Sequence, residues 1–133
     1  ISNQTQSEFG AEAKYQLAFL AFLESDYKKS EKIIFELVEN YFSDFFIAKS
    51  FILLADIYKE KNNLFQSKAT LQSIIDNYDG DDLRDISLNK ISEIDSLNQV
   101  SLMNSKNDEL IINLLNDVEL SELFEEENTL EDE

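Results

Sequence analysis

Carboxylates dominate the reactive side chains of this chain, which has 28 Asp and Glu residues but neither histidine nor cysteine. One acidic cluster, residues 76–82, invites comparison with a calcium-binding loop. If Gly80 held the sixth position of such a loop, Ile75 and Ile86 would hold the first and twelfth, where carboxylates are required. The cluster therefore predicts a turn that caps the following helix, and no metal site.

The other acidic pairs do not indicate catalysis. Asp81 and Asp82 fall in a predicted turn and Glu125–Glu127 in a predicted tail, where nothing encloses a carboxyl group to raise its pKa. Two isolated glycines cannot form a phosphate-binding loop. The absence of histidine removes the commonest general base and metal ligand. We therefore expect no enzyme activity, no cofactor and no metal.

The net charge of −17 excludes other classes of partner. The chain is close to neutral up to Tyr78, and most of the acidic excess follows it. Nucleic acids and anionic lipid surfaces attract clustered Lys and Arg and repel carboxylates, so we expect no nucleic-acid partner. No apolar run approaches the length of a membrane span, so no direct membrane insertion is expected.

One stretch of the sequence repeats with an offset of 37 residues. The identical pairs are Leu17-Ala18 with Leu54-Ala55, Ser30 with Ser67, and Asn40-Tyr41 with Asn77-Tyr78. A repeat of this length built from two helical patterns is typical of an α-solenoid, whose usual role is to bind other molecules. The chain has no proline and two glycines, which also favours an all-α fold.

Apolar periodicity predicts two antiparallel helix pairs, a C-terminal capping helix and a partly helical acidic tail. The expected helices span 11–23, 27–42, 45–61 and 64–78, with the capping helix at 82–100. The expected repeats are 11–44 and 48–81, within a helical domain over 1–103. The remainder, 104–133, is expected to hold a linker at 104–108, a short amphipathic segment and the acidic tail.

The residues at fixed positions of the two repeats match a known pattern. A small residue follows Leu17 and Leu54, and a small residue, Ser30 or Ser67, comes early in each second helix. The Asp/Asn–apolar turn is present as Asp26-Tyr27 and Asn63-Leu64. In this respect the chain resembles the tetratricopeptide family, which implies an α-solenoid. The sequence departs from the pattern at Ala21, where an aromatic residue is usual, and in its spacing, since that family's repeat is about 34 residues.

The run 7–13, which leads into Tyr15-x-Leu17-Ala18, is similar to segments of bacterial cell-envelope members of the family. Those members include outer-membrane-protein assembly lipoproteins and periplasmic coordinators of envelope constriction. The resemblance favours a periplasmic or outer-membrane-associated location, with the cytoplasm as the alternative. Two repeats are fewer than a stable solenoid normally has, so we expect the chain to be the C-terminal end of a longer repeat protein.

In this family the first helices of successive repeats line a concave groove. The resemblance therefore implies a protein-binding groove, whose residues would be Tyr15, Phe19, Phe22, Lys49, Ile52, Asp56 and Lys59. Its aromatic residues would hold apolar anchors of a peptide, and its lysines would pair with carboxylates. The same aromatics are also explained by packing against a further repeat or another segment of this chain.

A second apolar row lies near the C-terminus. It consists of Ile111, Leu114, Leu115 and Val118. This row could dock into the groove of its own chain, bind a partner, or mediate self-association. The sequence therefore predicts a non-catalytic scaffold for a peptide or protein partner in a bacterial envelope complex. The alternative is a structural or oligomerisation module that self-associates through this C-terminal segment.

Overall fold

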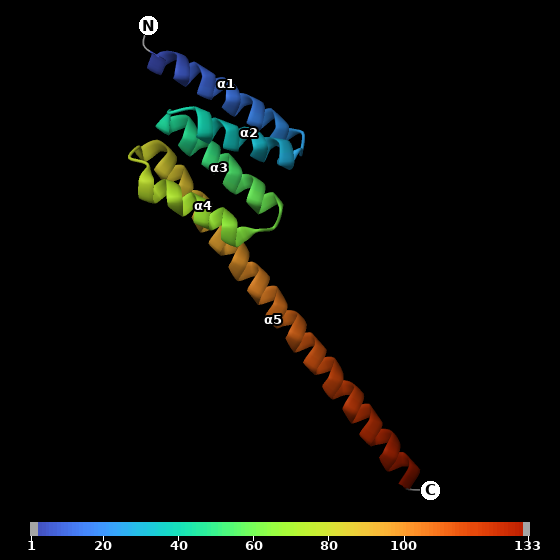
Figure 1. The fold of residues 1–133 in the computed structure, drawn as a ribbon. Helices are drawn as coiled ribbons and strands as arrows, with labels where there is room; N and C mark the ends of the chain where they lie inside the picture. The colour runs from blue at the N-terminus through green and yellow to red at the C-terminus, as the bar shows by residue number, and fades with distance from the viewer. Residues whose placement is uncertain (1–2, 132–133) are drawn as a thin grey trace. The chain divides into compact units, whose positions relative to one another are not determined.

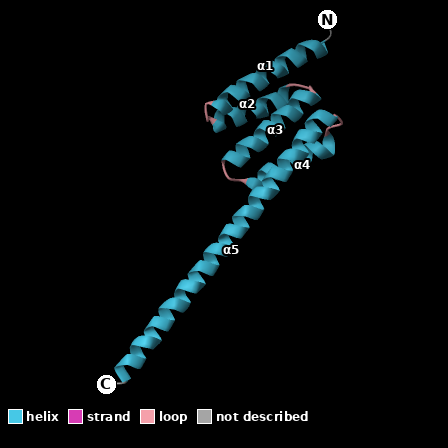
Figure 2. Ribbon diagram, turned by 180° about the vertical axis from the view of Figure 1, so that it is seen from behind, coloured by secondary structure: helices cyan, strands magenta, loops and turns pink. Residues whose placement is uncertain are grey.

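The computed structural model describes the backbone of residues 3–131 and the side chains of residues 7–123, and within them every element is an α-helix (Figures 1 and 2). The helices are α1 (Asn3–Leu23), α2 (Tyr27–Asn40), α3 (Asp44–Glu60), α4 (Leu64–Asn77) and α5 (Asp81–Glu131). The prediction of an all-α chain is confirmed for this part. The end of the expected acidic tail, residues 132–133, lies outside the described residues.

The chain divides into two units within α5. The first is Ile1–Ile94 and the second is Asp95–Glu133. Helices α1 to α4 and the first turns of α5 belong to the first unit, which contains the predicted groove residues. The second unit contains the predicted C-terminal apolar row.

The first unit is built from two helix pairs, α1 with α2 and α3 with α4 (Figure 1). The turns inside the two pairs have the same geometry. Ser25 and Asn62 take left-handed φ values of 62° and 59°. The next residues, Asp26 and Asn63, cap α2 and α4 by accepting a hydrogen bond from the backbone N–H three positions later. The two caps are 37 residues apart in the sequence, which is the repeat offset. The first and last residues of α2 and α4 are also 37 residues apart.

A buried serine holds the two helices of each pair together. The Ser30 hydroxyl donates a 2.7 Å hydrogen bond to the backbone oxygen of Ala18, and Ser67 donates an equivalent 2.7 Å bond to Ala55. All four residues are almost completely buried. Because serine and alanine are small, the two backbones can approach closely enough for a side chain of one helix to reach the carbonyl of the other.

Two apolar clusters form the core of the first unit. One joins α1 and α2 to α3, and its buried members are Ala18, Ile34, Leu53, Leu54 and Ile57. The other joins α3 and α4 to the start of α5, and its buried members are Ala48, Ile52, Ala55, Leu71, Ile74, Leu83 and Ile94. Burying one Leu or Ile side chain contributes about 1.5–3 kcal/mol. Through Leu83 and Ile94, the first turns of α5 pack against the second pair.

The expected linker at 104–108 is helical in the structure, so that prediction is wrong. Helix α5 runs without a break from Asp81 to Glu131. The segment Asn104-Ser-Lys-Asn-Asp108 is polar, but it contains no glycine or proline. Polar side chains alone do not stop a helix, because exposed positions accept them at a small cost in helix propensity.

Substitution of the buried serines by alanine should have opposite effects at different positions. Ser30→Ala and Ser67→Ala should each lower the free energy of unfolding by about 1 kcal/mol, because each loses a buried hydrogen bond. Ser50→Ala should raise it by about 1 kcal/mol, since the buried Ser50 hydroxyl has no hydrogen-bond partner in the described structure. Urea unfolding followed by circular dichroism measures all three. Equal destabilisation by the three changes would contradict this account.

Candidate functional site

Aromatic side chains and one lysine gather where α1 meets α3. We call this group the aromatic–lysine cluster, and its members are Tyr15, Phe19, Phe45, Phe46 and Lys49. The rings of Tyr15 and Phe19 stack with centroids 6.2 Å apart, and Tyr15 lies 6.3 Å from Phe46 across the two helices. All five side chains are partly exposed, so the cluster is an accessible aromatic surface.

Helix spacing and one cap position the cluster. Tyr15 and Phe19 lie four residues apart on α1, and Phe45 and Lys49 have the same spacing on α3, so each pair shares a helix face. The Ser43 side chain caps α3 by accepting a 3.3 Å hydrogen bond from the backbone N–H of Phe46. The start of α3, which carries both phenylalanines, is thereby fixed.

Lys49 lies over two of the rings. Its Nζ is 4.7 Å from the ring centroid of Tyr15 and 5.6 Å from that of Phe45. A cation over an aromatic face gains about 0.5–1 kcal/mol at an exposed site. That is small enough for the ammonium group to exchange the rings for a carboxylate brought by a partner.

The hydroxyl of Tyr15 is harder to ionise than an ordinary phenol. Partial burial raises its pKa above the usual value near 10, and the negative charge of Asp56 raises the pKa further. Tyr15 therefore remains a neutral hydrogen-bonding group throughout the physiological pH range.

The two other charged residues of the predicted groove are paired with the start of α5. Asp56 accepts a 2.9 Å hydrogen bond from the ammonium group of Lys90, and Lys59 lies 3.9 Å from the carboxylate of Glu93. Surface ion pairs of this kind contribute only about 0–1 kcal/mol each to the stability of the fold. Their main consequence is that the charges of Asp56 and Lys59 are balanced by residues of α5.

The remaining two predicted groove residues lie elsewhere. Ile52 is 8% exposed and belongs to the core cluster of α3, α4 and α5, so it supplies little surface. Phe22 packs against Tyr27, with ring centroids 5.7 Å apart. The structure thus brings Tyr15, Phe19 and Lys49 together, whereas Phe22 lies toward the turn between α1 and α2. Sequence reasoning missed Phe45 and Phe46, although their position directly after a predicted helix cap was a usable signal.

Searches of protein-family models, curated proteins and solved structures found no match to this chain. Its function must therefore be inferred from its own residues. Among the described residues, no group of three or more acidic side chains is placed to hold a metal ion. Within that same part, no helix is long and apolar enough to cross a membrane.

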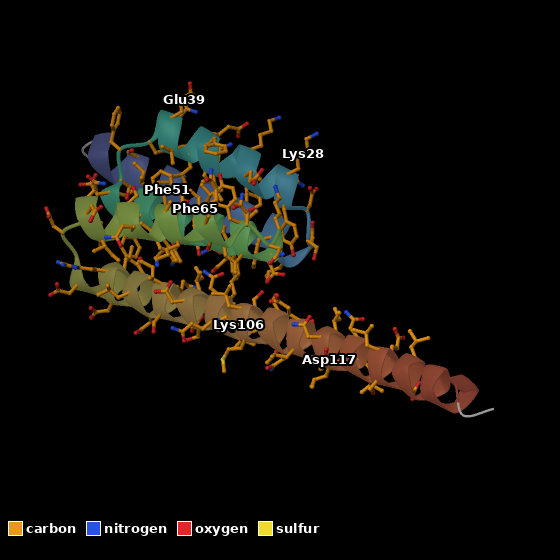
Figure 3. The ribbon with its side chains drawn as sticks, turned by 90° about the horizontal axis from the view of Figure 1, so that it is seen from below. Lys28, Glu39, Phe51, Phe65, Lys106 and Asp117 are labelled. Carbon is orange, nitrogen blue, oxygen red and sulfur yellow. The ribbon has the colours of Figure 1, made fainter. Side chains whose placement is uncertain are left out.

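A cavity of about 330 Å³ lies on a different part of the first unit, between α3, α4 and the turn before α5. None of the seven predicted groove residues lines it. The C-terminal row, in the second unit, is exposed along α5, with exposed fractions of 52% for Val118 and 64% for Leu114. Figure 3 shows the side chains of this part of α5 projecting from the helix around Lys106 and Asp117.

The Asp56→Asn change should lower the pKa of Tyr15, because it removes the negative charge that opposes ionisation of the phenol. Burial should keep the pKa above that of free tyrosine. An alkaline titration of the labelled ring carbons by NMR measures it. The pKa of the Tyr15 phenol is higher in the folded state than in the unfolded state. The contribution of Tyr15 ionisation to stability should therefore be complete below about pH 10, and it should be lost as the pH rises through the folded-state pKa.

The matched control for this titration is Glu60→Gln, which removes an exposed carboxylate from the end of α3. It should leave the pKa of Tyr15 almost unchanged, because solvent screens exposed charges. A Tyr15 pKa that fell equally in both variants, or in neither, would show that Asp56 has no specific effect.

Proposed function

We propose that this protein is a non-catalytic scaffold that binds a peptide or protein segment on the face that carries the aromatic–lysine cluster. The observation that carries this proposal is the position of Lys49 over the partly exposed rings of Tyr15 and Phe45. Tyrosine is enriched among the residues that dominate the binding energy of interfaces, and aromatic residues as a group are enriched in interface cores. The two helix pairs with equivalent turns and serine bonds support an α-solenoid similar to the tetratricopeptide family.

The expected ligand follows from the chemistry of this face. An apolar side chain of the ligand would pack on Tyr15 and Phe19, and an adjacent carboxylate would pair with Lys49. Asp56 and Lys59 are already paired with α5, so they add little net charge to the surface. The resemblance of the N-terminal run to cell-envelope proteins extends the proposal to an assembly in the bacterial envelope.

The first test is selection of binding peptides from a random displayed library on the intact chain, followed by measured affinities for variants. Lys49→Ala and Phe19→Glu should each weaken the selected peptides by about tenfold or more, since hot-spot substitutions cost about 2 kcal/mol. The control is Phe65→Ser on α4, where the ring is 83% exposed and lies outside the cluster. Phe65 is labelled in Figure 3.

Circular dichroism should show that each variant retains its helices. Because Phe19 also touches the core, Lys49→Ala decides the result if Phe19→Glu is poorly folded. Peptides that bind both cluster variants normally but lose affinity for Phe65→Ser would overturn the proposed site.

A second candidate function is self-association through α5, and a specific observation favours it. Apolar and asparagine side chains recur at alternating spacings of three and four residues along the second unit. This longer row differs from the four-residue C-terminal row described above, because it begins earlier and omits Leu115. It consists of Leu97, Val100, Asn104, Asn107, Ile111, Leu114 and Val118. Such spacing is typical of one strand of a coiled coil, and asparagine within the row restricts register and the number of strands.

Every residue from 96 to 123 is exposed in the described chain. A single helix of this kind gains no free energy from tertiary packing, which supplies most helix stability in proteins. Burying one apolar residue of the row contributes about 1.5–3 kcal/mol. A second copy of the row is therefore a partner that would stabilise the helix.

The chain should form dimers or larger oligomers as its concentration rises, and Ile111→Lys should shift it toward monomer, because it places a charge within the row. The control is Leu102→Lys. Position 102 lies nine residues away, which is about 180° around an α-helix, and its side chain is also exposed. Analytical ultracentrifugation measures both. A monomeric parent chain at all concentrations would rule out this second function.

A further inference from the structure

Tyr41 and Tyr78, the C-cap residues that directly follow α2 and α4, occupy equivalent positions, but their rings lie in different places. The ring of Tyr41 lies so close to Gly10 on α1 that any side chain at that position would collide with it. The ring of Tyr78 lies instead against Gly80, in the turn before α5, and its hydroxyl donates a 3.4 Å hydrogen bond to Asp82. Each of the chain's two glycines thus makes room for a tyrosine ring.

The residues around the two rings also differ between the pairs. At equivalent positions, the second pair has Ile47 for Gly10, Phe51 for Lys14 and Ser73 for Glu36. In the first pair, Lys14 and Glu36 form a 2.9 Å ion pair that joins α1 to α2. Both side chains are partly exposed, so the ion pair lies at the surface between the two helices. In the second pair Phe51 and Ser73 cannot form the equivalent ion pair, because neither side chain is charged.

These differences coincide with the 330 Å³ cavity. Its apolar wall includes Ile47, Phe51 and Ile74, and the ring of Tyr78 closes one side. Phe51 is labelled on α3 in Figure 3. The volume is at the lower end of the range for ligand pockets, about 300–1,000 Å³, which suits one apolar side chain better than a nucleotide or a large cofactor.

The rim of the cavity is acidic. Asp44, at the start of α3, and Asp79, in the turn before α5, both line it and are both exposed. One of these charges also acts on Tyr78, whose pKa is raised by burial first, then by Asp82, with a smaller effect of Asp44. An anionic ligand would be repelled here, whereas a cation beside the apolar group would be attracted.

We propose that the cavity between α3 and α4 is a second peptide-binding site, which takes one apolar side chain that is flanked in its peptide by lysine or arginine. The apolar side chain lies against Ile47, Phe51 and Ile74, and the flanking cations lie at Asp44 and Asp79. This site shares no residue with the aromatic–lysine cluster and prefers ligands of the opposite charge. It therefore does not depend on the function proposed above.

The test uses the intact ¹⁵N-labelled chain and the capped peptide acetyl-Lys-Leu-Lys-amide, with amide shifts measured by NMR at physiological salt. Saturable shifts are expected at residues 47, 51, 74 and 80. Replacing the peptide's leucine by alanine should weaken binding by about tenfold or more, because the apolar group is lost. Acetyl-Glu-Leu-Glu-amide should produce no saturable shifts at these residues.

Two protein variants complete the test. Phe51→Lys with Ser73→Glu introduces the ion pair of the first helix pair and should abolish the shifts. Asp44→Asn with Asp79→Asn changes only exposed side chains and should weaken binding by about threefold, as loss of weak surface charge pairs predicts. The control is Glu24→Gln with Glu39→Gln, which removes two exposed carboxylates from the first pair and should have no effect.

The site is refuted by absence of shifts at the four residues, by equal binding of the leucine and alanine peptides, or by shifts confined to the acidic end of the chain. The last result would mean that the peptide binds only through net charge. If Phe51→Lys with Ser73→Glu does not fold, the pair of aspartate substitutions and the alanine peptide decide the outcome.

Discussion

The close approach of the two helices in each pair depends on a serine hydroxyl that reaches a backbone oxygen of the neighbouring helix. Ser30 bonds to Ala18 and Ser67 to Ala55, both at 2.7 Å and both out of contact with water. A larger side chain at any of these four positions would separate the backbones and lengthen the bond. Because the bond joins the same register positions in each pair, it also fixes how one helix is placed along the other.

Differences between the pairs give the first unit its distinct surfaces. At the serines both pairs carry the same residue and form the same hydrogen bond. At the tyrosines the residue is again the same, but the rings lie in different places because their neighbours differ. Where their residues differ, the two pairs present different groups at equivalent surfaces. Lys14 and Glu36 form an ion pair across the first pair, whereas Phe51 and Ser73 line a cavity at the equivalent part of the second pair. A common backbone can therefore carry the two proposed sites, which differ in the charge of the ligand that each would prefer.

The regular parts of the fold could be predicted from sequence because their signals are local. The caps Asp26 and Asn63 precede apolar periodicity, and the observed bounds of α2 and α4 lie within two residues of those expected. The prediction of a linker at 104–108 is wrong, because α5 continues through this segment. Its residues are polar, but none of them is a proline, which would stop a helix.

The candidate site was harder to predict because exposure depends on neighbours far away in the sequence. Tyr15 and Ile52 share a register position, but Ile52 is buried in the cluster that α5 completes and Tyr15 is partly exposed. The cavity depends on the direction that the ring of Tyr78 takes, which follows from the presence of Gly80 and Ile47. The spacing of apolar residues along the sequence predicts neither the burial of Ile52 nor the direction of the Tyr78 ring.

The same dependence on neighbours explains why α1 exposes apolar side chains that α3 buries. Leu17 and Leu20 are 53% and 54% exposed, whereas their register equivalents Leu54 and Ile57 are 4% and 0% exposed. Residue type is nearly unchanged, so the difference arises because α1 and α2 pack against α3 and no described element packs in the same way against α1. Burial of such side chains releases about 25 cal/mol per Å² of apolar surface. This face of α1 is therefore a further region where contact with another helix would contribute hydrophobic free energy.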